Sequence, residues 1–252
     1  MRNGIFPVFT KGRVLKRESL EYLRDFPYDL AAIAFEEYAD GVLCGFSVSY
    51  EEGCIFISPG VLKYQNKIIV VSGSTVTLGK YGQLMYIKAV FGEDQKTEDF
   101  IICPVEIEID INEPIPENEM ELGRFCLENG AELRCRYDSF GDLRTAENTL
   151  DLTHVPYGGH GSPTLHPIVM KEYARTVLGS STDSSDTAFA LMCLNSPVVN
   201  KVAIQWHIAK KNNAEYEDCS LSSLYDKLFG TLFQCLPTNK MKMPRGRGPS
   251  IY

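Results

Sequence analysis

The chain has 252 residues, of which 44% are hydrophobic and 23% are charged. This composition is typical of a folded protein that buries its own core without needing disulfides or a structural metal. The net charge of −8 and the pI of about 5.1 argue against a protein that coats nucleic acid through a basic surface. No apolar run is long enough to span a bilayer, so we expect no membrane insertion.

Residues 1–40 are predicted to form an N-terminal arm and a helix. Pro7 interrupts any regular pattern in residues 1–16, which favours an extended arm. From Arg17 to Tyr38 apolar residues approximate one helical face, and Pro27 is expected to kink or split the helix. No apolar segment with a cleavage site opens the chain, so we expect cytoplasmic synthesis without a signal peptide. The apolar face consists of Leu20, Leu23, Tyr28, Leu30, Ile33 and Phe35.

Residues 41–137 are predicted to form a β-rich domain. From Val42 the hydrophobic period changes to two, in short β-branched and aromatic runs separated by turns such as Glu51-Glu52-Gly53 and Gln65-Asn66. Strands at this spacing indicate an antiparallel sandwich or barrel. The segment 121–137 is expected to close the domain as a hairpin around Glu128-Asn129-Gly130. The runs are VLCGFSVSY, CIFISPGVLKY, KIIVVSG, STVTL, LMYIKAVF and FIICPVEIEI.

The acidity of the chain is concentrated in residues 92–121. This segment holds eleven carboxylates and a single lysine, and the rest of the chain is slightly basic. Glu106, Glu108 and Asp110 alternate with isoleucines, which predicts a strand with one acidic and one apolar face. A solvated face is the commonest role of such a segment. The alternatives are a docking surface for a basic partner and a divalent-cation site.

The C-terminal half is predicted to contain a loop, a helical domain and a basic tail. Residues 138–166 are rich in Gly, Pro, Ser and Thr, which favours a linker or an ordered loop with its own contacts. Residues 167–238 are predicted to form four short helices, with Asp183 and Asp186 as capping residues. Residues 239–252 carry basic residues and no acid, and we expect them to become ordered only on binding.

Three histidines, His154, His160 and His166, lie at regular short intervals in the predicted loop. Imidazoles are good metal ligands, so the three are weak candidates for a metal site. The spacing matches no metalloenzyme motif, however, and loop hydrogen bonds or helix caps are the commoner role. His207, beside Trp206 in a predicted helix, is expected to pack or to face a partner.

The sequence contains no signature of catalysis or of cofactor binding. GxSxG, HExxH, the phosphate-binding GxxxxGK[ST] and the dinucleotide-binding GxGxxG are all absent. The eight cysteines include no CxxC pair, so we expect buried reduced thiols and no zinc site. We therefore predict a protein that is not an enzyme and that needs no cofactor.

Three stretches carry a family resemblance. Residues 42–73 contain a strand pair followed by an SPG-x-x-x-x-x-G/N-K turn, residues 121–136 read ELGRFCLENGAELRCR, and residues 148–174 lead into the C-terminal helices. Together they resemble baseplate and tail-fibre-attachment proteins of contractile phage tails and R-type bacteriocins, as in clostridial prophages. The first motif is carried here by Ser58, Pro59, Gly60, Asn66 and Lys67.

The expected fold class is α+β: an antiparallel β-sandwich or barrel-like body, preceded by an arm and a helix and followed by a small helical domain. The resemblance implies a non-enzymatic baseplate adaptor that binds other baseplate and tail-fibre proteins in a symmetric multi-copy assembly. Such a particle is released by lysis, and no nucleic acid is expected as a partner. The candidate partner-binding residues are Phe6, Pro7, Phe9, Arg245, Arg247 and Tyr252.

Two alternative functions follow from other features of the sequence. A β-sandwich with exposed aromatic residues is also typical of carbohydrate-binding modules, and the chain has thirteen tyrosines that could stack on sugars. A metal-dependent hydrolase that uses the three loop histidines is the less favoured alternative.

Overall fold

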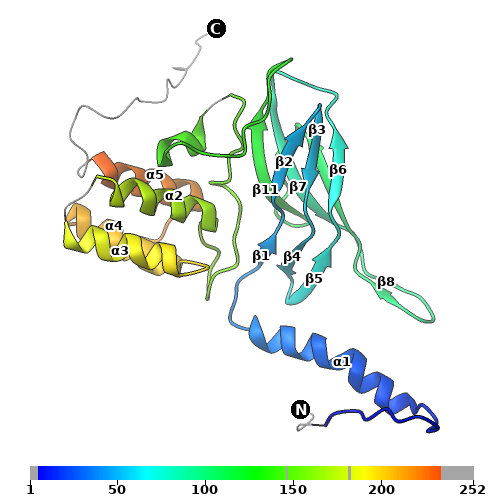
Figure 1. Ribbon diagram of the computed structural model, residues 1–252. Coiled ribbons are helices and arrows are strands. Elements are labelled where there is room, and N and C mark those ends of the chain that lie inside the picture. Colours follow the sequence, from blue (N-terminus) through cyan, green and yellow to red (C-terminus); the bar gives the residue numbers. More distant parts are fainter. Residues whose placement is uncertain (1–4, 146, 181–182, 234–252) are drawn as a thin grey trace.

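The computed structural model describes residues 5–145, 147–180 and 183–233. A projecting N-terminal helix precedes a body of antiparallel strands, and a bundle of four helices follows it (Figure 1). The predicted α+β class is therefore confirmed, while the domain boundaries at residues 40, 137 and 166 stay predictions. The helices are α1 (Arg17–Ala34), the short 3-10 helix η1 (Phe140–Arg144), α2 (Pro167–Leu178), α3 (Ser184–Asn195), α4 (Lys201–Asn212) and α5 (Leu221–Phe233).

The first half of the β-body is a three-stranded antiparallel meander that is bent across its middle. Each of its three chain segments passes through two short strands, so that one half of the meander has the order β1-β4-β5 and the other the order β2-β3-β6. The expected runs 42–50 and 54–64 are thus each divided at the bend. The strands are β1 (Gly41–Gly45), β2 (Val48–Glu51), β3 (Cys54–Ile57), β4 (Gly60–Tyr64), β5 (Lys67–Val71) and β6 (Ser74–Thr77).

The SPG motif lies at this bend, where the chain segments approach one another too closely for larger residues. A Cβ atom on Gly60 would lie 2.2 Å from the ring of Phe46, and one on Gly45 would lie 2.3 Å from the carbonyl oxygen of Pro59. The predicted turns join the segments: Gln65 and Asn66 both have positive φ, 48° and 62°. This pair of left-handed residues is what a tight two-residue hairpin of the type I′ class requires.

The second half of the β-body is a sheet with the order β10-β7-β11, from which a small hairpin of β8 and β9 projects (Figure 1). The predicted closing hairpin is only partly formed. The chain turns at Gly130, whose φ is +82°, but the returning residues form no strand and make a single isolated bridge, from Arg134 to Thr149. The strands are β7 (Leu84–Phe91), β8 (Gln95–Lys96), β9 (Ile101–Ile102), β10 (Val105–Asp110) and β11 (Glu119–Cys126).

The four C-terminal helices pack around buried aromatic and aliphatic residues. Tyr173 of α2 is fully buried, and its hydroxyl lies 2.8 Å from Nε2 of His207 in α4, so the packing role expected for His207 is confirmed. Asp183 caps α3 by accepting a hydrogen bond from the Ser185 N–H, as predicted. Asp186 lies in the first turn of the same helix, where it is buried and forms an ion pair of 2.6 Å with Lys211.

The cysteines are less buried than the sequence suggested. Among the described residues only Cys193 is buried, Cys44 is exposed, the others lie between these extremes, and none forms a disulfide. Cys103, Cys135 and Cys219 lie in connecting segments outside the helices and strands, where burial is less complete than in the core. Within the described part of the chain, no helix has both the length and the apolar character needed to cross a bilayer.

Candidate assembly surface

Helix α1 has an apolar side that no other part of the described chain covers. The helix has no buried residue, and with about 3.6 residues per turn its larger apolar side chains gather on one side. Tyr28 lies with the charged residues, contrary to the predicted face, and Phe35 follows the helix as its C-cap. The apolar side consists of Leu20, Leu23, Phe26, Leu30 and Ile33, which are 46–66% exposed.

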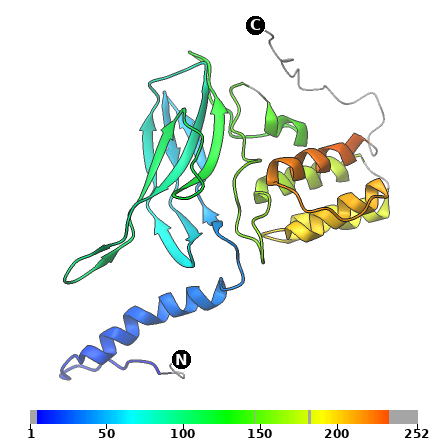
Figure 2. The same cartoon turned by 180° about the vertical axis from the view of Figure 1, so that it is seen from behind.

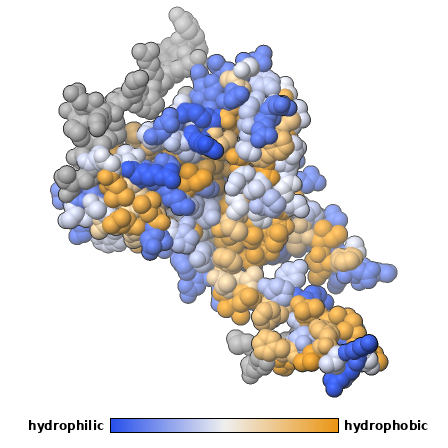
Figure 3. Space-filling view, viewed as in Figure 1, coloured by the Kyte–Doolittle hydropathy of each residue, from blue (hydrophilic) through white to orange (hydrophobic). Residues whose placement is uncertain are grey.

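Pro27 does not split α1, which is a single helix from Arg17 to Ala34. The helix projects away from the β-body in both ribbon views (Figures 1 and 2). Figure 3 shows hydrophobic side chains gathered on the projection that α1 and the arm form. A helix that packs on its own domain buries its apolar side. The exposed side of α1 therefore indicates a surface that another chain covers.

The described part of the arm, residues 5–16, is also exposed and apolar. Phe6 is 73% and Phe9 is 54% exposed, while Pro7 between them is half-buried. The three predicted partner-binding residues of the arm therefore lie at the surface, as a docking role needs. Arg245, Arg247 and Tyr252, the candidates in the basic tail, lie outside the described residues.

The C-terminal end of α1 is fixed to the β-body by Lys63. This lysine of β4 is only 5% exposed, and its ammonium group donates hydrogen bonds of 2.8, 3.0 and 2.6 Å to the carbonyl oxygens of Phe35, Glu36 and Tyr38. These carbonyls belong to the C-cap of α1 and to the turn that follows it, beside the end of the helix that carries partial negative charge. A buried cation at this end therefore holds the helix and sets its direction.

A second set of contacts joins the residues after α1 to the loop 138–166. The Ala39 N–H donates to the Gly159 carbonyl oxygen at 2.8 Å, and the Gly161 N–H donates to the Glu37 carbonyl oxygen at 2.9 Å. The Tyr38 and His160 rings lie 4.4 Å apart, centroid to centroid. We call residues 35–42 and 156–161 together the junction.

The described residues of the loop 138–166 join the junction to the helical bundle. Tyr157 donates a hydrogen bond of 2.8 Å to the carbonyl oxygen of Leu43 in β1, and Thr164 donates one of 2.6 Å to the carbonyl oxygen of Val199, just before α4. Earlier in the loop, Arg144 pairs with Asp226 of α5. The described part of this loop therefore contacts both the β-body and the helical bundle.

The structure does not bring the three loop histidines together. His154 lies 3.9 Å from a carboxylate oxygen of Asp151, and His160 lies in the junction. His166 caps α2 by accepting from the Ile168 N–H at 3.1 Å, and burial lowers its pKa to about 4. Among the described residues no three His, Cys, Asp or Glu side chains are arranged to hold a metal ion.

The predicted acidic strand β10 has the expected alternation. Glu106 and Glu108 are exposed, whereas Asp110 is partly buried. The buried Lys88 of β7 pairs with Asp110 at 3.2 Å and with Glu119 at 3.0 Å. Burial alone would lower the pKa of Lys88, but the hydrogen bonds to the two carboxylates outweigh it and the pKa is raised. Part of the acidic segment is thus an internal ion-pair network. Glu121 is also buried, where it pairs with Arg124, and the other carboxylates of the segment are exposed.

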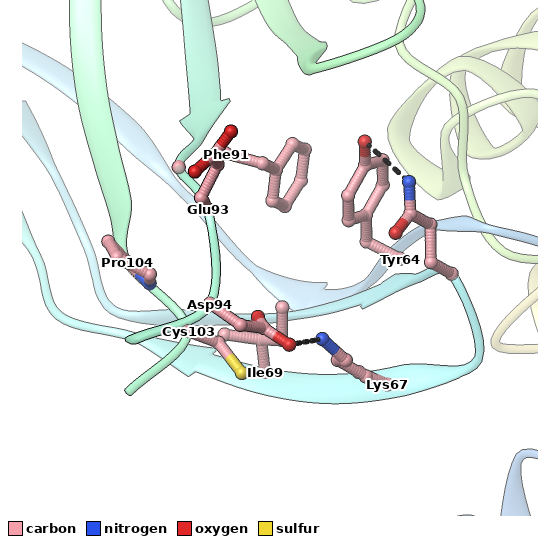
Figure 4. A pocket seen from close by; sticks show the side chains of 10 residues that line it. Tyr64, Lys67, Ile69, Phe91, Glu93, Asp94, Cys103 and Pro104 are labelled. Carbon is pink, nitrogen blue, oxygen red and sulfur yellow. Dashed lines mark hydrogen bonds and ion pairs between the residues drawn. The ribbon is translucent and has the colours of Figure 1, made fainter. Parts of the chain in front are cut away.

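A shallow groove lies where the β8–β9 hairpin leaves the body (Figure 4). The rings of Tyr64 and Phe91 stack there with centroids 3.7 Å apart and an interplanar angle of 6°. Lys67 at the start of β5 pairs with Asp94 across the groove. Cys103 lines the same groove, and burial, followed by its hydrogen bond to Asp94, raises the pKa of its thiol.

Sequence reasoning missed the residues that anchor α1. Lys63 looks like an ordinary outward lysine of a strand, and only its position between Leu62 and Tyr64 in a predicted core strand hints at burial. Its acceptors are backbone carbonyls, which leave no mark in the sequence. The apolar side of α1, in contrast, is visible from sequence; what sequence cannot show is that nothing in the described chain covers it.

Comparisons with known proteins identify no family. No protein-family model and no curated protein matches the chain. Among solved structures it is similar to one described as the crystal structure of TssK, with a TM-score of 0.38 and 10% sequence identity. That match covers 92% of this chain and 69% of the other. Such a similarity carries no argument about function, which has to be inferred from this chain's own surfaces.

Proposed function

We propose that the protein is a non-enzymatic structural component of a contractile-tail baseplate, which binds neighbouring subunits through α1 and the N-terminal arm. The observation that carries the proposal is the uncovered apolar side of α1, held out from the body by Lys63. The resemblance of residues 42–73 and 121–136 to baseplate proteins gives the kind of assembly. The match to the TssK structure is too distant to add support.

The physical argument concerns the free energy of the exposed side chains. Burying a leucine, isoleucine or phenylalanine side chain fully is worth roughly 1.5–3 kcal/mol. The five large apolar side chains of α1 are about half exposed, so a partner that covers them gains several kcal/mol in total. A fixed helix also loses little conformational freedom on binding, which lowers the cost of association.

The proposal is tested by finding the chain in assembled particles. Tail-sized particles are sedimented from an induced producing culture, and the chain is quantified by mass spectrometry against the sheath subunit. We expect a small fixed ratio. Recovery of the chain only in the light soluble fraction would overturn the proposal.

A matched pair of variants tests the role of α1. Leu23→Glu with Leu30→Glu places two charges on the apolar side, and Tyr28→Glu with Ala32→Glu places two on the opposite side. Glutamate is a good helix former, so both variants should keep α1. We expect the first variant to be absent from particles and the second to be incorporated normally. Equal incorporation of both would show that α1 is not the docking element.

A further inference from the structure

One side of the β-body is sealed and the other is open. On the sealed side the loop 138–166 covers the outer edge of β11. Arg124 of β11 and Asp151 of the loop exchange backbone hydrogen bonds of 3.0 and 2.7 Å. On the open side β10 pairs only with β7 and β5 only with β4 within the described part of the chain. β6 and β10 lie in contact, so the gap is confined to the stretch between β5 and the start of β10. We call this gap the open seam.

The side chains along the open seam are incompletely covered. Ile69 of β5 and Val105 and Ile107 of β10 pack against the core but remain partly exposed, whereas Met120 and Leu122 of the sealed side are buried. Inward-facing residues of a closed sandwich are normally buried on both sheets. The open seam is therefore a place where the body lacks a covering segment.

Two adjoining hollows, of about 360 and 430 Å³, run along the open seam and share Ile69 and Cys103. One end is closed by the stacked Tyr64 and Phe91 rings (Figure 4). The walls also include Glu106 on the β10 side. An unpaired strand edge beside part-exposed apolar residues is the kind of site that accepts an extended segment as an added strand.

The N-terminal arm has the properties of such a segment. Residues 5–9 read IFPVF, and their backbone groups take part in no strand and no backbone hydrogen bond among the described residues. Val8 is 74% exposed. Pro7 lacks an N–H group, so the segment can pair along one edge only, as proline in a sheet requires. Lys11 and Arg13 follow the segment and complement the acidic wall of the open seam.

The geometry of α1 favours the open seam of another copy over that of the same chain. The arm joins α1 at the end far from the β-body (Figures 1 and 2). An 18-residue helix is about 27 Å long, and residues 10–16 span at most about 25 Å when fully extended. If the arm folded back along its own helix, residues 10–16 would therefore fall short of the far end of α1 even when fully extended.

We propose that residues 5–9 of one copy lie as an added strand in the open seam of a second copy. This inference rests on the proposed function in assuming assembly, and it names the receiving site of the arm. Each copy offers one arm and one open seam at different places on its surface, so the contact is heterologous. Contacts of this type build rings or chains of subunits.

The proposal is tested with full-length chain carrying Val8→Cys, since Cys103 already lines the open seam. Under a mild oxidant at slightly alkaline pH, across a concentration series, we expect disulfide-linked dimers and larger species that disappear on reduction. Peptide mapping should join the arm peptide, through its introduced thiol, to the peptide that holds Cys103. Adding Cys103→Ala to this variant should abolish the link. Val14→Cys, also exposed and on the same arm, is the matched control and should not form it.

The outcomes separate the possibilities. A link to Cys103 within single chains would show that the arm occupies its own open seam and would overturn the proposal. Equal linking by the Val14→Cys control, or no link to Cys103, would overturn it as well. If the chain is still found in sedimented particles, failure of the link refutes only this inference. Absence from particles refutes the proposed function whatever the result of the linking.

Discussion

Replacing Lys63 with methionine should release the junction while leaving the β-body folded. Methionine has a similar unbranched shape, so the core position is kept, but the three carbonyl oxygens of Phe35, Glu36 and Tyr38 lose their donor. Hydrogen bonds to a charged group contribute about 1.5–3 kcal/mol each. Because these hydrogen bonds are only partly buried, water can replace part of what is lost, and we expect a net loss of about 3 kcal/mol for local opening.

Hydrogen exchange measured by mass spectrometry reports this local opening. A loss of about 3 kcal/mol corresponds to roughly a hundredfold faster exchange. The increase should appear at amides that bond across the junction, such as those of Ala39 and Gly161, and not in peptides of β7. Lys67→Met removes a partly exposed lysine of the neighbouring strand, which pairs with Asp94 and not with the junction, and is the control. Unchanged exchange at Ala39 in Lys63→Met, or the same increase in the control, would refute the anchoring role.

Three further predictions concern stability. Gly60→Ala should lower the free energy of unfolding by about 1–3 kcal/mol in denaturant titrations, since its Cβ would meet the Phe46 ring at 2.2 Å. Arg144→Ala should cost about 2–4 kcal/mol. It removes an ion pair, a hydrogen bond and a ring contact from the loop to α5, as well as a hydrogen bond to Thr153 within the loop. Burial lowers the pKa of His207 from 6.5 to about 4, so stability should fall as the pH falls through that range, and His207→Gln should flatten the fall by up to about 1.4 kcal/mol per pH unit.

Each of these predictions has a control. Gly79→Ala adds a Cβ in open space and should change stability little, so an equal loss there would contradict the steric argument. Arg136→Ala changes a nearby arginine, and a loss as large as that of Arg144→Ala would remove the case for the specific contacts. The sign of the pH effect follows from the unfolded chain binding the proton first. If His207→Gln showed the same pH dependence of the free energy of unfolding as the unchanged protein, the role of His207 would be contradicted.

The parts of the fold that were predictable are those with a local pattern. The period-two runs, the Gln65-Asn66 turn and the Asp183 cap depend on a few neighbouring residues, and the structure confirms them. The bend of the meander was not predicted, because it requires Gly45, Phe46 and Gly60 from two segments to meet. The closing hairpin was wrong for a similar reason, since Arg134 forms its bridge to Thr149 of the later loop and not to β11.

The candidate assembly surface also has one part that the sequence predicts and other parts that it does not. The apolar side of α1 was predicted from spacing, although with Tyr28 wrongly included. The anchorage of α1 by Lys63 was not predicted, because the lysine binds backbone carbonyl oxygens, which every residue carries. The open seam likewise cannot be predicted from the sequence, since a strand edge is unpaired only when no other strand of the fold lies beside it. Such features depend on distant parts of the chain and require coordinates.

The junction has a mechanical consequence. A helix of about 27 Å that is held at one end acts as a lever, and a force on its free end is multiplied at the holding point. Two sets of contacts hold α1 at this point. Lys63 transmits the force to the β-body, and the backbone hydrogen bond between Ala39 and Gly159 transmits it to the loop that continues into the helical bundle. Tilting of α1 by a neighbour would therefore strain both halves of the protein at once.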